Sequence, residues 1–400
     1  MEFQFNEKEN AFRKQVEQFL QAELPPDWPG KSTHWPGGYG SMEMRDDPEL
    51  VESARRFRKK LAQKGWLTIA WPKEYGGKQY TYMEQAIYDE RISYYRAPGT
   101  GIGVGIAGPT ILHFGTDQNK KEWIPRIAGG EIEMWLGYSE PDSGSDLASI
   151  QTTAVEDGDH YIVNGQKIWS TIAHIADYAW MIVRTDPDAP KHKGISFLIV
   201  DNASPGVTIR PLINIVGVHS FNEVFFDNVR VPKKNLIGEK NMGFYYLMLA
   251  LDFERLMVGI GGFKRVLEEL TAVVHESKRD KRRLADYEDV RKKLALISTK
   301  LEIAYMFFWR TAEKLDKGQN TSVEASALKL SCTELSRQLA NVAMEILGPY
   351  SQLMMSSKYA PFRGMAPRGY LDCISATVGA GSSEIMRNII AVRGLGLPRK

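Results

Sequence analysis

Residues 138–147 read Tyr138-Ser-Glu-Pro-Asp-Ser-Gly-Ser-Asp-Leu147 and directly follow a strand-like apolar run. The small residues in this segment can present successive backbone N–H groups and hydroxyls to a phosphate or to a carbonyl of a bound ligand. The segment contains no lysine of the kind that a nucleotide-binding P-loop requires. Taken alone, it is also typical of an ordinary turn rich in Ser, Asp and Gly.

A second segment, residues 164–171, reads Asn164-Gly-Gln-Lys-Ile-Trp-Ser-Thr171. The Asn-Gly turn leads into a strand that brings the indole of Trp169 close to the hydroxyl of Thr171. This pair suits stacking beside a planar ring and donating a hydrogen bond to the ring's edge. A β-hairpin with a core tryptophan is the alternative interpretation.

Both segments lie in the middle third of the chain, about residues 131–239, where the apolar period falls towards two. Strand-like runs begin at Asp177, Gly194 and Glu223. Residues 156–159, Glu-Asp-Gly-Asp, predict a tight hairpin connection in which Gly158 supplies the positive φ that such turns need. The middle third is therefore predicted to be a β-domain.

The two flanks are helical in pattern. Phe12, Val16, Phe19 and Leu20 recur at helical spacing, residues 50–66 form another amphipathic stretch, and a loop rich in Pro, Gly and Trp separates them at 25–40. After residue 241 long helices are predicted at 243–277, 287–315 and 322–347, and a last one from Ser382. Such lengths with short connections indicate a bundle. We expect an α+β chain with a helical domain at 1–130, a β-domain at 131–240 and a helical bundle domain at 241–400.

Composition favours a folded protein that handles small molecules. Of the 400 residues 25% are charged and 43% belong to the nine apolar types, so disorder and a membrane protein fit poorly. A net charge of +2 gives no argument for nucleic acid binding. Cys332 and Cys373 and the scattered histidines predict neither a disulfide framework nor a metal site. An acidic N-terminus fits no signal peptide, so we expect a cytoplasmic location or an already processed chain.

The two segments together closely resemble those of the acyl-CoA dehydrogenase family of flavoproteins, and the likeness extends over essentially the whole chain. Further matching pieces follow in the family's order: Gly-Trp at 65–66, Pro-Lys-Glu-Tyr-Gly-Gly at 72–77, Phe-Phe-Asp-Asn-Val-Arg-Val-Pro at 225–232 and Gly-Ala-Gly-Ser-Ser-Glu-Ile-Met-Arg-Asn at 379–388. The resemblance implies a C-terminal four-helix bundle, tightly bound FAD and usually a homotetramer. It also implies an electron-transfer flavoprotein as the electron acceptor.

The resemblance also assigns candidate FAD contacts. Tyr138, Ser139, Trp169 and Thr171 would face the flavin ring. The remaining candidates are Ser145 at the diphosphate with Gly144 beside it, Arg283 at the diphosphate of the neighbouring subunit's FAD, Glu345 and Gly348 at the adenine half, and Ser382 and Glu384 at the start of the last helix. Elementary helix chemistry leaves a second role open for Ser382, which can equally be the N-cap of that helix.

Two departures from the family concern the far end of FAD. The usual Arg-Phe-Gly sequence is missing, and the basic residues of 278–283 are spaced differently, so Arg279 and Arg282 stay open beside Arg283. The usual Gln-x-x-Gly-Gly element reads Glu345-Ile-Leu-Gly-Pro, with a carboxylate in place of an amide. We therefore expect FAD to be held differently at this end.

The most consequential departure concerns the catalytic base. Many family members carry it as Glu in a Tyr-Glu-Gly-Thr sequence, where this chain has Ala380. A smaller branch, including isovaleryl-type and long-chain-type enzymes, carries a Glu immediately before an Arg on an earlier helix, and here Glu254 precedes Arg255. At 3.6 residues per turn Glu254 would share an apolar line with Leu247, Leu251 and Val258. A buried ion pair inside the bundle is the alternative role.

The resemblance implies FAD-dependent α,β-dehydrogenation of an acyl-CoA to the trans-2-enoyl-CoA. Glu254 would remove the α-proton and flavin N5 would accept the hydride. Ala380, through its backbone N–H, together with Arg255 and Tyr94, would lie on the substrate side. Tyr95 and residues 99–105 are further candidates for the acyl pocket.

Three alternatives to this reading stay open. One is a subunit of a hetero-oligomeric acyl-CoA dehydrogenase for bulky or steroid-like acyl chains, and another is a flavin-dependent monooxygenase on the same fold. The third is a flavin-free scaffold that binds thioesters. The sequence leaves the acyl chain itself open.

Overall fold

The computed structural model describes residues 4–26, 28, 35–36, 47–254 and 258–398. Backbone contacts group the chain into two compact units. The helical unit comprises residues 1–41, 81–98 and 255–400, and the sheet unit comprises residues 42–80 and 99–254. The domain boundaries expected near residues 130 and 240 stay a prediction. Most of the loop expected at 25–40 lies outside the described residues.

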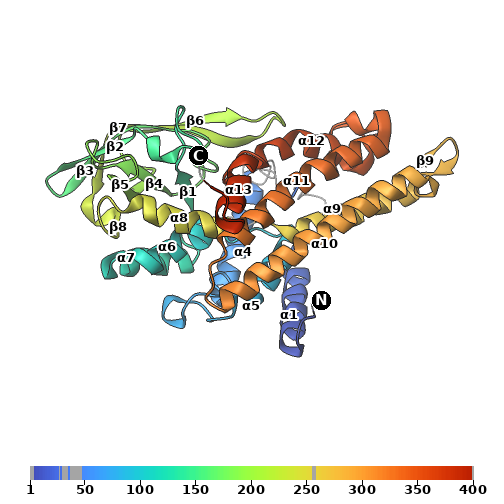
Figure 1. Ribbon diagram of the computed structural model, residues 1–400, viewed down its shortest axis with the longest axis horizontal. Helices are drawn as coiled ribbons and strands as arrows, with labels where there is room; N and C mark the ends of the chain where they lie inside the picture. The colour runs from blue at the N-terminus through green and yellow to red at the C-terminus, as the bar shows by residue number, and fades with distance from the viewer. Residues whose placement is uncertain (1–3, 27, 29–34, 37–46, 255–257, 399–400) are drawn as a thin grey trace. The chain divides into compact units, whose positions relative to one another are not determined.

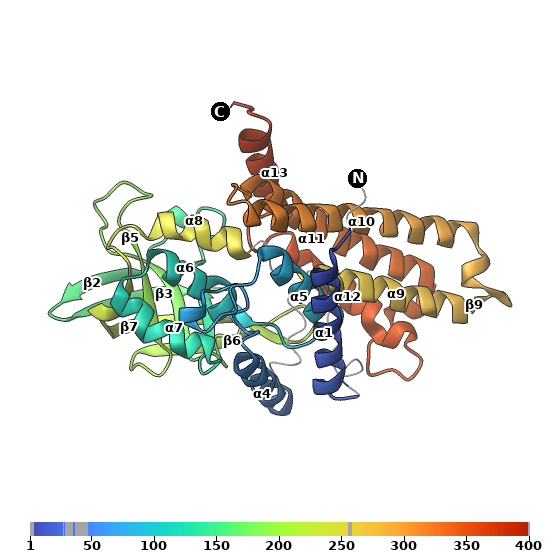
Figure 2. The same ribbon diagram turned by 90° about the horizontal axis from the view of Figure 1, so that it is seen from below.

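The helical unit is built around a bundle of long helices (Figures 1 and 2). In the bundle α10 (Glu288–Asp316) packs on α9 (Ile260–Glu276) and α11 (Ser322–Leu347), and α11 also packs on α12 (Met365–Ala376). The described helices of this unit are α1 (Glu7–Glu23), α5 (Tyr82–Tyr94), α9 (Ile260–Glu276), α10 (Glu288–Asp316), α11 (Ser322–Leu347), α12 (Met365–Ala376) and α13 (Ser383–Ile389). A short hairpin of β9 (Lys278–Arg279) and β10 (Arg282–Arg283) joins α9 to α10.

Local sequence explains where α1 begins and which face it buries. Asn6 accepts a hydrogen bond from the Glu9 backbone N–H, and the Glu9 side chain accepts one from the Asn6 N–H, which completes a capping box. Phe12, Val16 and Leu20 are buried, as their spacing predicts. The predicted helices at 287–315 and 322–347 are also confirmed, as α10 and α11.

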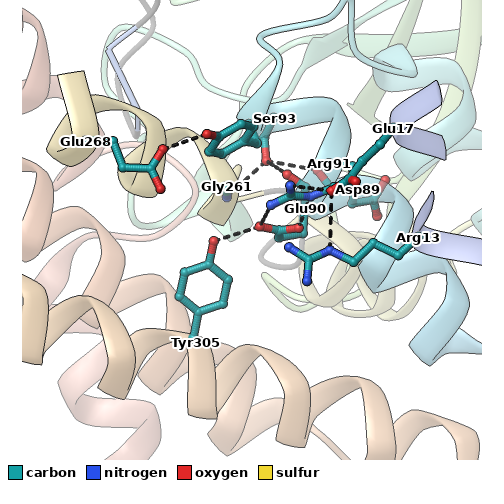
Figure 3. Close-up of polar contacts among 10 residues, drawn as sticks. Arg13, Glu17, Asp89, Glu90, Arg91, Ser93, Gly261, Glu268 and Tyr305 are labelled. Atoms are coloured by element: carbon teal, nitrogen blue, oxygen red, sulfur yellow. Dashed lines mark hydrogen bonds and ion pairs between the residues drawn. The ribbon is translucent and has the colours of Figure 1, made fainter. Parts of the chain in front are cut away.

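Buried charges on α5 tie the helical unit together (Figure 3). Glu90 and Arg91 are 3% and 5% exposed and form an ion pair with each other. Arg91 also donates to Glu17 on α1 at 2.9 Å, and the Tyr305 hydroxyl on α10 donates to Glu90 at 2.9 Å. Because each buried charge has hydrogen-bonding partners, the network fixes how α1 and α10 meet α5.

The start of α9 packs directly against α5. The Gly261 N–H donates to Ser93 Oγ at 3.1 Å, and a Cβ on Gly261 would lie 2.0 Å from the Glu90 carbonyl oxygen. Only glycine therefore fits at this close approach.

The prediction of a single helix over 243–277 is wrong in one respect, because the structure has two helices among the described residues of this range. The structure has α8 (Gly243–Glu254) in the sheet unit and a new helix, α9, from Ile260. Gly259 has a φ of 62°, which interrupts the helical conformation just before α9. Val258 consequently precedes α9, and the apolar line expected through Leu247, Leu251 and Val258 is not a line on one helix.

The sheet unit contains a mixed sheet in the order β6-β7-β3-β2-β4-β5-β8, with β1 also paired to β4 (Figure 1). The strands are β1 (Met134–Gly137), β2 (Thr153–Asp157), β3 (His160–Lys167), β4 (Tyr178–Arg184), β5 (Ile195–Asp201), β6 (Val207–Ile213), β7 (His219–Pro232) and β8 (Leu236–Ile237). The predicted hairpin is confirmed, since Asp157 pairs with His160 and Gly158 has a φ of 58°.

Four described helices belong to the sheet unit: α4 (Pro48–Lys64), α6 (Gly108–Phe114), α7 (Asp117–Ala128) and α8. Asp47 caps α4 and Gly65, at φ 69°, ends it, which confirms the amphipathic helix expected at 50–66. The order of helices, sheet and helices along the chain confirms the predicted fold class. Within the described ranges, the helices are all too short or too polar to cross a bilayer.

Candidate functional site

The two segments singled out in the sequence meet in the sheet unit. The Ile168 N–H donates to the Ser139 carbonyl at 3.0 Å, and Lys167 Nζ donates to the Tyr138 carbonyl at 3.3 Å. The Tyr138 hydroxyl in turn accepts a hydrogen bond from Trp180 Nε1 at 3.0 Å. The segment after β1 and the end of β3 thus lie side by side at residues 138–139 and 167–168.

Trp169 is not a core residue. Its side chain is 59% exposed, and its backbone has a φ of 58°. The ring meets Phe221 edge-on with a centroid distance of 5.9 Å. The alternative of a core tryptophan is therefore wrong, and the indole is free to stack on a planar ligand next to the half-buried Thr171.

The loop that contains Gly144 and Ser145 is open. Both residues are exposed, and a Cβ on Gly144 would meet no atom within 4 Å. Ser143 shapes the loop by donating from Oγ to the Asp146 carbonyl at 2.6 Å. Exposed backbone at Gly144 and Ser145 suits contact with a phosphate.

A buried ion pair, which sequence reasoning did not single out, joins the two segments. Lys167 Nζ lies 2.7 Å from Glu140 Oε1, and the side chains are 0% and 6% exposed. Glu140 also accepts hydrogen bonds from the backbone N–H groups of Gln151 and Thr152, at 2.5 and 3.0 Å. Two buried charges thus connect the segment after β1 to the end of β3.

The ionisation of the pair follows from its surroundings. Burial raises the pKa of Glu140, but the Lys167 charge and the donated hydrogen bonds more than offset this, so the pKa lies below its usual range. Burial lowers the pKa of Lys167 to about 8, because Glu140 compensates the lost hydration only in part. Both groups are therefore charged near neutral pH.

In the helical unit, the loop after α12 carries Ala380, one of the residues expected on the substrate side. Ala380 has a φ of 55° and Gly381 a φ of 90°. The buried Lys329 of α11 donates to the carbonyls of Ala376 and Gly381, at 3.0 and 2.6 Å. A lysine that the sequence analysis did not single out thus holds this strained loop.

Ser382 is the N-cap of α13. Its Oγ accepts a hydrogen bond from the Ile385 N–H at 3.3 Å. Glu384 is exposed in the first turn, where hydrogen bonds from the backbone and from Ser382 lower the pKa of its carboxyl.

The three arginines that the sequence leaves as candidates lie on the hairpin between α9 and α10, and all are exposed. They are Arg279, Arg282 and Arg283. Arg279 donates to the Ile346 carbonyl at 3.0 Å, which places it beside the end of α11. Arg283 instead pairs with Asp286 at 3.2 Å, and the Arg282 guanidinium lies 4.7 Å from the ring centroid of Tyr287.

The end of α11 carries the two residues expected at the adenine half, Glu345 and Gly348. Glu345 forms an ion pair with Lys293 at 2.6 Å, and its side chain is 57% exposed. Gly348, with a φ of 63°, ends α11. The Glu345 carboxylate thus has a cationic partner in its own unit.

The substrate-side candidate Tyr94 takes part in the contact of α5 with α9. Its hydroxyl donates to Glu268 at 2.6 Å, and the Arg91 guanidinium lies 4.5 Å from its ring centroid. Burial and the Glu268 carboxylate raise the pKa of Tyr94. The backbone of Glu254 ends α8, whereas its side chain and the whole of Arg255 lie outside the described residues.

Comparisons with known proteins agree along the chain. The models of the acyl-CoA dehydrogenase N-terminal, middle and C-terminal domains match residues 6–131, 136–229 and 241–395. The acyl-CoA dehydrogenase FadE26 of Mycobacterium tuberculosis is 37% identical over 355 residues, which cover 86% of this chain and 88% of FadE26.

Two solved structures are also similar over the full length of both chains. The ChsE4-ChsE5 complex from Mycobacterium tuberculosis has 33% identity and a TM-score of 0.88, with 100% of each chain covered. The Tcur3481-Tcur3483 steroid ACAD has 30% identity and a TM-score of 0.88, again with 100% of each chain covered.

Proposed function

Because this chain belongs to the acyl-CoA dehydrogenase family, we propose that it oxidises an acyl-CoA to the trans-2-enoyl-CoA with Glu254 as the base. The assignment of Glu254 as the base rests on the residues at two positions in the sequence. Ala380, where the base of many relatives stands, has no carboxylate, while a Glu-Arg dipeptide stands at residues 254–255. Glu254 would take the α-proton, which a positioned carboxylate can accept.

The other roles concern binding and orientation. FAD, when bound, supplies the acceptor for the hydrogen and two electrons that leave the β-carbon. The backbone N–H of Ala380 would donate to the thioester carbonyl and so stabilise the charge that develops there. Arg255 and Tyr94 would contact the substrate.

The residues proposed to hold FAD are those that the resemblance to the family assigns. The exposed indole of Trp169 and the open backbone of Gly144 support a planar ring with a phosphate nearby. The proposed contacts are Tyr138, Ser139, Gly144, Ser145, Trp169 and Thr171 in the sheet unit, and Arg283, Glu345, Gly348, Ser382 and Glu384 in the helical unit.

We expect the purified protein to be yellow and to contain non-covalent FAD, close to one per chain. Heat denaturation followed by chromatography of the released flavin measures this. Trp169→Leu should weaken FAD binding because the stacking face is lost, whereas Tyr359→Leu removes an aromatic side chain of similar exposure, 69%, and should not. Release of FMN, or of no flavin, would contradict the proposed contacts.

We expect an oligomer, and propose a homotetramer, because family members complete each FAD site with a neighbouring subunit. Exposed apolar side chains of the helical unit, including Tyr350, Ile374 and Val378 at 66%, 52% and 67%, support such burial. Analytical ultracentrifugation of the holoprotein tests this. A monomer that retains FAD would contradict the proposal, and co-purification with a second similar chain would favour a hetero-oligomer.

The acyl chain of the substrate can be identified with a panel of acyl-CoAs. We propose an electron-transfer flavoprotein as the acceptor, in line with the family. Anaerobic bleaching of the flavin by linear, branched and steroid-like acyl-CoAs ranks the substrates, and the steroid ACAD among the similar structures justifies the last group. A monooxygenase would instead consume oxygen with reduced flavin.

The cytoplasmic location expected from the sequence stays a prediction.

A further inference from the structure

The segment that follows β3 has an unusual backbone. Trp169 and Ile172 have φ values of 58° and 59°, and a β-branched residue at positive φ is a genuine outlier. Such a conformation persists only where the surrounding contacts determine it. The contacts that hold residues 169–172 therefore control how Trp169 and Thr171 are presented.

Asn222 on β7 supplies several of these contacts. It is 0% exposed, and its backbone carbonyl accepts a hydrogen bond from the Ser170 N–H at 3.1 Å. Its side-chain Nδ2 donates to the Ser170 carbonyl at 2.9 Å. Both peptide groups of Ser170, the residue between Trp169 and Thr171, are thus bonded to one buried asparagine.

The same amide also contacts two histidines. Asn222 Nδ2 lies 3.1 Å from His174 Nδ1, and Asn222 Oδ1 lies 2.8 Å from His219 Nε2. Because the Ser170 carbonyl can only accept, the amide must turn its NH₂ group towards it, and the second hydrogen of that group points at His174. His174 Nδ1 must then accept and carry no proton, while His219 Nε2–H donates to Oδ1.

Protonation of His174 would conflict with this arrangement. A proton on Nδ1 would face the amide NH₂, and the added charge would lie against the His219 ring, which stacks on His174 with a centroid distance of 3.7 Å. Arg55 and Glu52 of α4 are the charged groups that line the same cleft of about 540 Å³. His174 and His219 also line this cleft.

We propose that Asn222 is a positioning residue for residues 169–171, and that it holds them only while His174 is neutral. Lowering the pH then loosens the proposed contacts of Trp169 and Thr171 with FAD. The inference rests on the proposed function, because it takes these two residues as FAD contacts.

The test measures the affinity of the apoprotein for FAD between pH 5.5 and 7.5 by flavin fluorescence. If His174 must be neutral for tight binding, the dissociation constant rises as the pH is lowered over this range, by at most about tenfold per pH unit because one proton is taken up. In His174→Asn the side-chain oxygen can replace Nδ1 as acceptor but cannot be protonated, so the affinity should stay constant. The matched control is His160→Asn, at the far end of β3. In this variant the dissociation constant for FAD should depend on pH as steeply as in the wild type.

Two further measurements separate the inference from the proposed function. Asn222→Leu should weaken FAD binding at every pH and abolish the slope. In the ¹⁵N spectrum of the histidine-labelled apoprotein at pH 7.5, the signal lost in His174→Asn should show an unprotonated Nδ1. A protonated Nδ1, or an unchanged slope in His174→Asn, would overturn the inference alone. Wild-type protein that binds no FAD at any pH would overturn the proposed function, whereas the tautomer measurement would still apply.

Discussion

Glu254→Gln is expected to lower the rate of flavin reduction by the best acyl-CoA by about 10²- to 10⁴-fold, the usual contribution of a positioned base. Glutamine preserves the volume of the side chain and part of its hydrogen bonding, but it accepts no proton. The FAD content and the melting temperature should stay close to those of the wild type. Anaerobic stopped-flow absorbance measures the rate.

The alternative role of Glu254, an ion pair with an arginine, predicts the opposite pattern. The substitution would then lower the melting temperature and leave the rate within a few-fold of the wild type. Glu239→Gln, which removes an exposed carboxylate ahead of α8, serves as the matched control and should change neither quantity. Partial recovery of the rate in the double variant Glu254→Gln/Ala380→Glu would indicate that both positions address the same α-carbon.

Local patterns predicted those parts of the fold that local physics determines. The spacing of Phe12, Val16 and Leu20 identifies the buried face of α1, and Gly158 identifies the hairpin between β2 and β3. The segments at 138–147 and 164–171 were expected to act together, and the hydrogen bond from Ile168 to Ser139 shows that they meet.

Helix α12 and the interruption before α9 could not be predicted in this way. Helix α12 contains Pro367 and Gly369, which are poor helix formers. A Cβ on Gly369 would lie 2.2 Å from the Trp35 ring, so this residue is fixed by a contact more than 300 positions away in sequence. Periodicity identifies which face of a helix is apolar, but not which distant residue packs on it.

The grouping of α1 and α5 with the C-terminal helices has a similar origin. Glu90 is bonded to Tyr305, which is 215 positions away in the chain. Charged residues usually indicate an exposed face, and here they are buried because each finds partners on another helix.

The buried polar residues of the site occupy positions in the strand pattern from which their burial could have been predicted. Strand β7 buries alternate residues, and Asn222 occupies an inward position between Ser220 and Val224. Lys167 likewise takes a buried position at the end of β3. A polar residue at an inward position of a strand needs a buried partner, so it indicates a specific hydrogen-bonded contact even though the sequence does not identify the partner.

Lys167→Met is expected to destabilise the protein by about 3–5 kcal/mol, because it leaves the Glu140 carboxylate buried without its counter-charge. Urea denaturation of the holoprotein at pH 7.5 measures the loss. The destabilisation should shrink at acid pH. An unpaired buried carboxylate takes up a proton readily and then carries no charge, whereas the low pKa of Glu140 in the wild type keeps its contribution until the pH falls well below 4.5.

The matched control is Lys233→Met, which breaks the pair of Lys233 with Glu156 in the same unit. Those side chains are 39% and 41% exposed, so water replaces the lost partner and stability should change little. The double variant Glu140→Gln/Lys167→Met should recover part of the loss because no buried charge remains. Equal losses in Lys167→Met and Lys233→Met would show that burial of the Glu140 charge does not govern the stability of this site.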